Sequence, residues 1–139
     1  MDDSYDLQRF VVAQTPVYDT VCTELRAGRK RSHWMWFIFP QIEGLGSSAM
    51  ARAFAIASAD EAQAYLAHPI LGPRLRACSQ LVADLDGRVI DAIFGYPDDM
   101  KFQSSMTLFA QVATDHAVFN ACLQKYFGGV PDSATLARL

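Results

Sequence analysis

The sequence predicts an all-α protein, a single compact domain of about six to eight short helices spanning residues 1–139. Apolar residues recur at helical spacing along most of the chain, and the alternation typical of strands is almost absent. Hydrophobic residues make up 51% of the chain and charged residues 19%, which excludes a disordered or collagen-like protein. A length of 139 residues fits one domain, and no repeat or linker divides it.

Two short helices are expected before Gly28. A first apolar face begins at Leu7 and ends near Thr15, and a second repeats every four residues from Val17 to Leu25. Thr15 is followed by a proline, and this pair is typical of an N-cap and a first helical residue. The second helix should therefore begin there and end at the glycine.

The run Trp34–Phe39 is the one segment with strand character. Periodicity alone does not separate a short buried strand from a buried helix. An isolated strand would leave its backbone groups unpaired inside a helical protein, which is costly. Ser32 also stands where an N-cap belongs. We therefore expect residues 33–39 to form a buried helical turn or two.

The rest of the chain carries clear helix boundaries. Ser58 and Glu61 form a capping box, so a helix should run from there to His68. The next helix should end at Gly87, because its apolar residues are spaced alternately by four and three. Further helical segments are expected in four places: a turn or short helix at 89–94, a helix that starts at Pro97, one that is capped by Thr114 and stops at Gly128, and a tail helix after Pro131.

Charge and cysteine content indicate a cytoplasmic protein. The formal net charge of -3 argues against general affinity for nucleic acid or an anionic membrane. The N-terminus resembles neither a secretory signal nor a transit peptide, and the longest apolar run is far too short to cross a bilayer. Cys22, Cys78 and Cys122 are widely spaced, so we expect buried thiols rather than disulfides. The cysteines and histidines lack the spacing of metal ligands, and no metal is expected.

Residues 44–49 match the dinucleotide-binding pattern G-x-G-x-x-A. In such a site the glycines let the backbone approach a pyrophosphate at a helix N-terminus. The context does not fit, because Pro40, Gln41 and Glu43 interrupt the preceding run and no second strand–helix–strand unit follows. We interpret the motif as a turn before a serine-capped helix, and we expect no cofactor.

A basic cluster precedes the apolar run. Four of the twelve Lys and Arg residues fall within six positions, Arg26, Arg29, Lys30 and Arg31, and His33 follows. Guanidinium groups, a serine hydroxyl and free backbone N–H groups could converge on a phosphate here. The alternative is a solvated, positively charged helix end, which the helix dipole favours.

Lys101, Ser104 and Ser105 share one stripe of the helix that starts at Pro97. Lysine can neutralise a phosphate or lower the pKa of a nearby hydroxyl, so this stripe could border a cleft. The alternative is close helix packing through the two serines, with the lysine in solvent.

His33, Trp34 and Trp36 stand beside the basic cluster. An imidazole there could transfer protons, although most such histidines are hydrogen-bonded packing residues. The tryptophans could be core anchors, or one of them could stack on a planar ring at a pocket edge. Asp98 and Asp99 could form an acid/base pair, but the positive end of a helix explains them without a function.

The string GRKRSHWMWFIFPQ at residues 28–41 resembles the signature of a bacterial family, domain of unknown function 1810. Further matching strings are GLG at 44–46, YLAHP at 65–69, LGPRL at 71–75, IFG at 93–95, PDD at 97–99, SSMTLF at 104–109 and YFGG at 126–129. The resemblance implies a small, mainly α-helical cytoplasmic protein, with no activity or catalytic residue to transfer. Many members carry the label calpastatin, but calpastatin inhibitory repeats are disordered, whereas this composition is that of a packed globule.

These observations lead to one binding hypothesis and one alternative. An anionic, nucleotide-like small molecule would bind in a basic and aromatic pocket built from two segments, which must meet in space. The residues assigned to it are Arg29, Lys30, Arg31, His33, Trp34 and Trp36 from the first segment and Lys101, Ser104 and Ser105 from the second. The alternative is a non-enzymatic protein–protein interaction module with an exposed apolar patch and no enclosed polar cavity.

Overall fold

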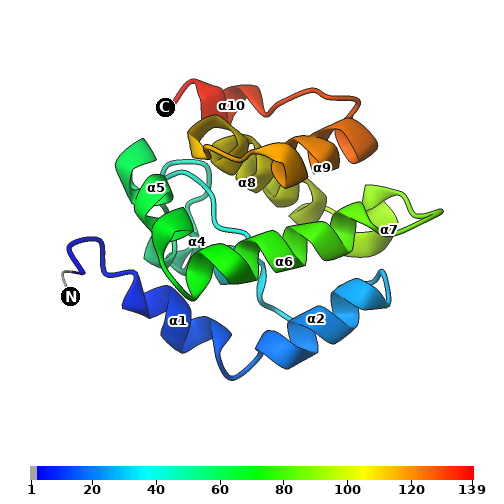
Figure 1. The fold of residues 1–139 in the computed structure, drawn as a ribbon, viewed down its shortest axis with the longest axis horizontal. Helices are drawn as coiled ribbons and strands as arrows, with labels where there is room; N and C mark the ends of the chain where they lie inside the picture. Colours follow the sequence, from blue (N-terminus) through cyan, green and yellow to red (C-terminus); the bar gives the residue numbers. More distant parts are fainter. Residues whose placement is uncertain (1–2) are drawn as a thin grey trace.

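The computed structural model describes residues 3–139, which form ten helices packed around one core (Figure 1). The longer helices are α1 (Gln8–Gln14), α2 (Tyr18–Arg26), α5 (Ala59–Ala67), α6 (Leu71–Ala83), α8 (Asp98–Val112) and α9 (Ala117–Phe127). The short ones are α3 (Met35–Ile38), α4 (Ala49–Ala53), α7 (Ile90–Phe94) and α10 (Ser133–Leu136). The all-α class is confirmed. The predicted number of about six to eight helices lies between the six helices of seven or more residues and the total of ten within residues 3–139.

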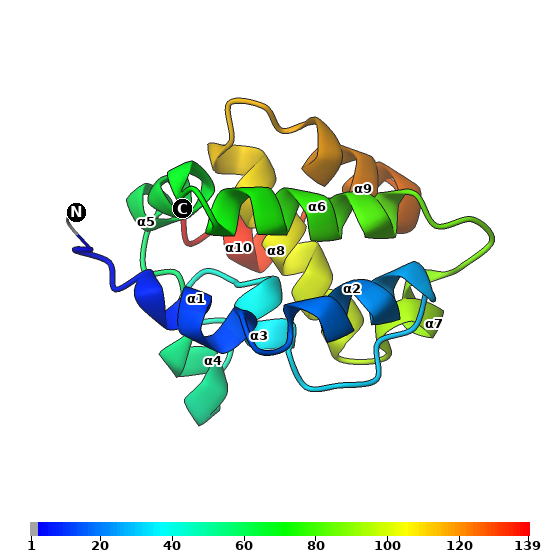
Figure 2. The ribbon, with the colours of Figure 1, turned by 60° about the horizontal axis from the view of Figure 1, so that its bottom comes forward.

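Helix α8 lies at the centre of the fold, and α5, α7, α9 and α10 pack against it (Figures 1 and 2). Its residues 104–110 are all buried, polar ones included, because neighbours cover this part of the helix on every side. Helix α6 crosses the domain and contacts α2, α5 and α9. Within the described part of the chain, no helix combines the length and apolar character needed to span a membrane.

The apolar run forms the short helix α3, as predicted, and is largely buried. Ser32 does not cap this helix, which corrects the prediction, because its hydroxyl donates a hydrogen bond to Glu24 instead. The N-cap is Trp34, without a side-chain hydrogen bond. Residues 3–139 contain no strand, only an isolated parallel bridge between Ile42 and Ile56.

The predicted helix caps have mixed outcomes. The Ser58 hydroxyl accepts the backbone N–H of Glu61 at 3.1 Å, as expected of a capping box. Ser48 caps α4 in the same way after the glycine turn, as predicted. The predicted caps at Thr15 and Thr114 are wrong. Thr15 ends α1 and donates its hydroxyl to a carbonyl of that helix, and α9 begins only at residue 117.

Helices α5 and α6 meet at a tight corner over residues 66–72. A Cβ atom at Gly72 would overlap the backbone carbonyl oxygen of Leu66, so a larger residue does not fit there. His68 supports the corner, because its Nδ1 accepts the backbone N–H groups of Ile70 and Leu71 at 3.1 and 3.3 Å. The corner fixes how closely α5 approaches α6.

The three cysteines are free and buried, as predicted. Burial raises the pKa of Cys78 and of Cys122 to about 12. Both thiols therefore stay protonated at neutral pH and pack as small apolar groups.

Candidate functional site

The segment between α2 and α3 alternates between exposed and inward-facing residues. The exposed residues are Arg29, Arg31 and His33, and those turned toward the protein are Lys30, Ser32 and Trp34. Extended chain places successive side chains on opposite sides. One basic string therefore divides into two sets with different surroundings.

The inward set is held by Glu24, a carboxylate on α2 that is 8% exposed. Its Oε1 accepts the backbone N–H groups of Arg31 and Ser32 at 2.7 and 3.0 Å and the indole N–H of Trp34 at 2.9 Å. Its Oε2 accepts the Ser32 hydroxyl at 2.6 Å. Burial disfavours the charged form, but these hydrogen bonds outweigh burial and lower the pKa of Glu24 to about 2.

The sequence analysis did not single out Glu24, although a signal was present. Glu24 adjoins Leu25 and follows Val21 by three positions, and both apolar residues are fully buried. A carboxylate on the apolar side of a helix, just before a basic string, indicates a buried acceptor for that string.

Lys30 and Lys101 meet on one carboxylate. The Nζ of Lys30 lies 2.8 Å from Oδ2 of Asp98, and the Nζ of Lys101 lies 3.4 Å from its Oδ1. Each ammonium group also lies over an indole, at 5.2 Å from the ring centroid of Trp34 and 4.8 Å from that of Trp36, respectively. This lysine bridge (Lys30, Asp98 and Lys101) brings together the two segments that the binding hypothesis requires to meet.

The serines of the second segment lie away from the bridge. The Ser104 hydroxyl is 3.1 Å from the carbonyl of Met100 and 3.1 Å from Oδ2 of Asp132, so it links α8 to the N-cap of α10. Ser105 is fully buried, and its hydroxyl has no hydrogen-bond partner among the described residues. Both serines thus face packed protein rather than solvent.

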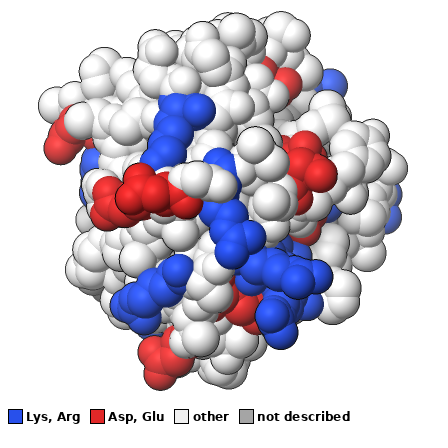
Figure 3. Space-filling view, turned by 90° about the vertical axis from the view of Figure 1, so that its right-hand side faces the viewer, with Lys and Arg blue, Asp and Glu red and all other residues white. Residues whose placement is uncertain are grey.

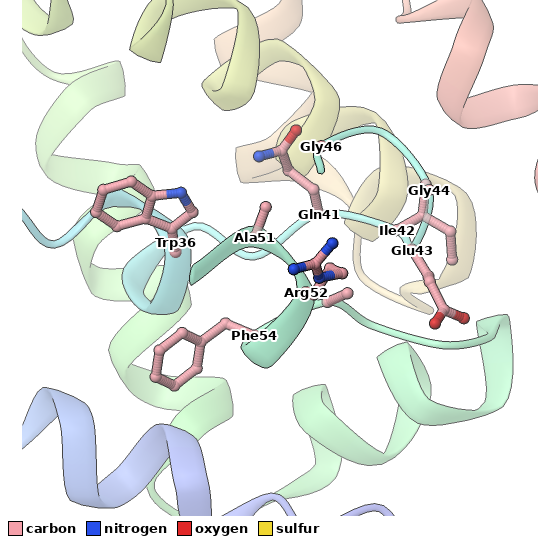
Figure 4. Close-up of a pocket in the computed structure, with 10 residues that line it drawn as sticks. Trp36, Gln41, Ile42, Glu43, Gly44, Gly46, Ala51, Arg52 and Phe54 are labelled. Atoms are coloured by element: carbon pink, nitrogen blue, oxygen red, sulfur yellow. The ribbon is translucent and has the colours of Figure 1, made fainter. Parts of the chain in front are cut away.

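The two tryptophans differ in exposure. Trp34 is 1% exposed, packs against Phe39 and Phe94, and donates its N–H to Glu24, so it is a core residue. Trp36 is partly exposed, and its indole N–H has no hydrogen-bond partner in the chain from residue 3 onward. Trp36 lines a narrow cleft between α3 and α4 (Figure 4).

Several exposed arginines lie at one end of the molecule. Arg29 and Arg88 line an open depression of about 450 Å³ together with Lys30, and Arg26 and Arg31 flank this depression in the chain. Figure 3 faces this end of the fold and shows basic side chains crowded on it. We call Arg26, Arg29, Arg31 and Arg88 the arginine face.

None of the four side chains of the arginine face forms a hydrogen bond or ion pair within residues 3–139. By contrast, Arg9, Lys30 and Lys101 each pair with a carboxylate. An unpaired guanidinium presents a planar fork of donors that matches phosphate and carboxylate oxygens. Asp91 also lines the depression and reduces the positive potential on its own side.

These features belong to a defined class of small helical proteins. A family model described as "Protein of unknown function (DUF1810)" matches residues 4–139, so the chain is a member of that family, as the sequence resemblance predicted. The fold is similar to the crystal structure of the conserved hypothetical protein Rv1873 from Mycobacterium tuberculosis, with a TM-score of 0.98 and 58% sequence identity. The match covers 99% of this chain and 98% of that one. No match was found among curated proteins.

Proposed function

We propose that the protein binds an anionic, nucleotide-like small molecule through its phosphates at the arginine face. The observation that carries this proposal is a depression lined by two arginines without partners among the described residues, Arg29 and Arg88, in a chain of net charge -3. Arg26 and Arg31, which are also unpaired there, lie close to Arg29 in the sequence. Each guanidinium can take two phosphate oxygens, so several of them suit a ligand with more than one phosphate. A depression of about 450 Å³ is within the size range of small-molecule sites.

The residues beneath the face support this role. Glu24 and the lysine bridge hold the backbone of residues 30–34, so a ligand would not have to order the loop that carries Arg29 and Arg31. Trp34 is buried below this segment and offers no ring for stacking. Recognition at this face would therefore rest on charge and hydrogen bonds.

A thermal-shift experiment with ADP, ATP, NAD and ADP-ribose tests the proposal, with adenosine as the control that lacks phosphate. A ligand present at ~100 times its Kd should stabilise the protein by ~2.7 kcal/mol. The effect should fall with added salt. The double variant Arg29→Ala/Arg88→Ala should lose most of it. Arg76→Ala removes a charge from the surface near α5 and should respond like the unmodified protein.

Two results would refute the proposal. One is that no phosphate ligand raises the unfolding midpoint. The other is that the double variant responds as strongly as the unmodified protein.

A second candidate function, docking on an acidic partner protein, is favoured by exposed apolar residues at the same end. Val89, Tyr96 and Met100 are 69%, 78% and 53% exposed and flank or follow α7. Large apolar side chains beside cations are typical of interface anchors. A photo-reactive residue at position 96 should then cross-link an acidic protein in cells, while one at the exposed position 111 should not.

A further inference from the structure

An open groove of about 470 Å³ runs between α2 and α6, which lie side by side (Figures 1 and 2). On the α2 side it is lined by Tyr18, Cys22 and Arg26, which are spaced four residues apart and therefore share one face of the helix. On the α6 side it is lined by Ala77 and Leu81. The groove thus gives solvent a path to the thiol of Cys22, which is 8% exposed.

A hydroxyl and a second thiol meet Cys22 between the two helices. The hydroxyl of Tyr18 makes side-chain hydrogen bonds to Cys22 and to Cys78 of α6. The two thiols also make a side-chain hydrogen bond to each other. Cys78 is completely buried, so Cys22 is the more accessible of the two. We call Tyr18, Cys22 and Cys78 the thiol cluster.

Cys22 is the hydrogen-bond acceptor of the thiol cluster. Burial, followed by the two thiols, raises the pKa of Tyr18, and burial, followed by Cys22, raises the pKa of Cys78 to about 12. Both groups therefore keep their protons at neutral pH and donate to the Cys22 sulfur. Two donors stabilise negative charge on that sulfur, and the thiolate is the form of cysteine that attacks an oxidant.

The groove suits a small, uncharged oxidant. Asp19 and Arg26 line it with opposite charges, so it does not strongly favour an ion of either sign. Because so little of the Cys22 side chain is exposed, a bulky oxidant such as a peptide disulfide cannot reach its sulfur. Hydrogen peroxide is neutral and close to water in size, so it meets both conditions.

We propose that Cys22 and Cys78 form a reversible disulfide when the protein meets hydrogen peroxide. The Cys22 thiol first loses its proton to solvent, and its sulfur attacks one peroxide oxygen. The O–O bond breaks, the departing hydroxide takes up a proton and leaves as water, and Cys22 becomes a sulfenic acid.

In the second step, the Cys78 sulfur attacks the Cys22 sulfur. The S–S bond forms, the S–O bond breaks, and the hydroxide leaves with the Cys78 proton as a second water. Two thiols have then been oxidised by two electrons, and one peroxide has been reduced to two waters. A small-molecule thiol in excess restores both cysteines by thiol–disulfide exchange.

The third cysteine of the chain is an internal control. Cys122 lies on α9 and is completely buried, and its thiol donates to the backbone carbonyl of Ser79 at 3.4 Å. Burial raises its pKa, and the charged groups that act on it are Lys125 and Asp84. Its hydrogen-bond partner is thus backbone rather than a second thiol. Cys122 should therefore stay reduced under conditions that oxidise Cys22.

Mass spectrometry of the intact protein after treatment with hydrogen peroxide provides the test. The protein should lose the mass of two hydrogen atoms, and a thiol reductant should restore the original mass. Free thiols are then alkylated in denaturant, and the protein is digested without reduction. The digest should contain one cross-linked pair of peptides, which joins Cys22 to Cys78, and Cys122 should be alkylated.

Three variants separate the two steps. Cys78→Ala should form no disulfide and should retain a sulfenic acid on Cys22, which dimedone traps. Cys22→Ala should form neither the disulfide nor the dimedone adduct. Cys122→Ala should be oxidised like the unmodified protein.

Three results would overturn the proposal, and each is read from the unmodified protein. The first is that all three thiols survive the peroxide treatment. The second is that Cys22 gains two or three oxygen atoms while Cys78 stays a thiol. The third is that the cross-link involves Cys122 or a second chain. None of these results bears on phosphate binding at the arginine face, which is measured by thermal shift.

Discussion

Beneath the arginine face, Glu24 accepts four hydrogen bonds and Asp98 forms ion pairs with two lysines. On the face itself, the side chains of Arg29 and Arg31 have no hydrogen-bond or ion-pair partner among the described residues. Lys30 of the lower layer and Arg29 and Arg31 of the upper layer are adjacent cations in the same short stretch of chain. The difference between them shows that the role of a charged residue depends on the partners of its side chain, not on its place in a basic string. The lower layer should govern stability, and the upper layer should govern binding.

Replacing Glu24 should produce the largest effect on stability. Glu24→Ala leaves the indole N–H of Trp34, the hydroxyl of Ser32 and two backbone N–H groups without their acceptor. We expect a loss of about 3 kcal/mol in the free energy of unfolding, measured by urea titration. A loss below about 1 kcal/mol would contradict the anchoring role of this carboxylate.

Replacing Lys30 should produce the second-largest effect on stability. Lys30→Ala removes both the ion pair with Asp98 and the contact over Trp34, and we expect a loss of about 2 kcal/mol. Lys30→Met keeps an apolar stem over the ring and should lose less. Equal losses of unfolding free energy in the two variants would show that the apolar stem of Lys30 contributes nothing to stability. The whole loss would then come from the charge.

Acid should weaken the lower layer in a defined pH range. The pKa of Glu24 is about 2 in the folded protein and 4.5 ordinarily, so the unfolded chain takes up this proton first. The stability that Glu24 contributes is thus present above pH 4.5 and is lost as the pH falls toward 2. Between pH 6 and pH 3 we expect a loss of about 1–2 kcal/mol by urea titration, and Glu24→Gln should abolish this part of the pH dependence.

The smallest effect on stability is expected in the upper layer. Arg29→Ala and Arg31→Ala remove no side-chain hydrogen bond or ion pair between residues 3 and 139, so the free energy of unfolding should change by less than about 0.5 kcal/mol. A change above about 1 kcal/mol in the absence of ligand would show that the arginines are structural and would remove the contrast between the layers.

Helix positions could be predicted from the sequence because apolar spacing is a property of the local chain. Individual caps were less predictable, since a hydroxyl has several acceptors within reach. Thr15 bonds back to α1, and Ser32 bonds to Glu24, which is eight residues away in the sequence. Which acceptor a hydroxyl binds depends on tertiary packing, and the local spacing of residues does not encode that packing.

The candidate site was predictable in its location but not in its layers. The basic string and Lys101 do meet, but through Asp98, which the sequence explains by the helix end alone. Nothing in the spacing of Trp34 and Trp36 indicates which of them is buried. Gln41 and Glu43, interpreted only as residues that interrupt an apolar run, line the narrow cleft between α3 and α4.

The corner at Gly72 has a consequence for tracing the history of this family. Its constraint is steric and acts between two backbones, so it is independent of any ligand. If the ligand changes over evolution, surface arginines can drift, while this position cannot accept a side chain without forcing α5 away from α6. A divergent sequence that retains a glycine at this corner is therefore a better candidate for common descent than one that retains only the basic string.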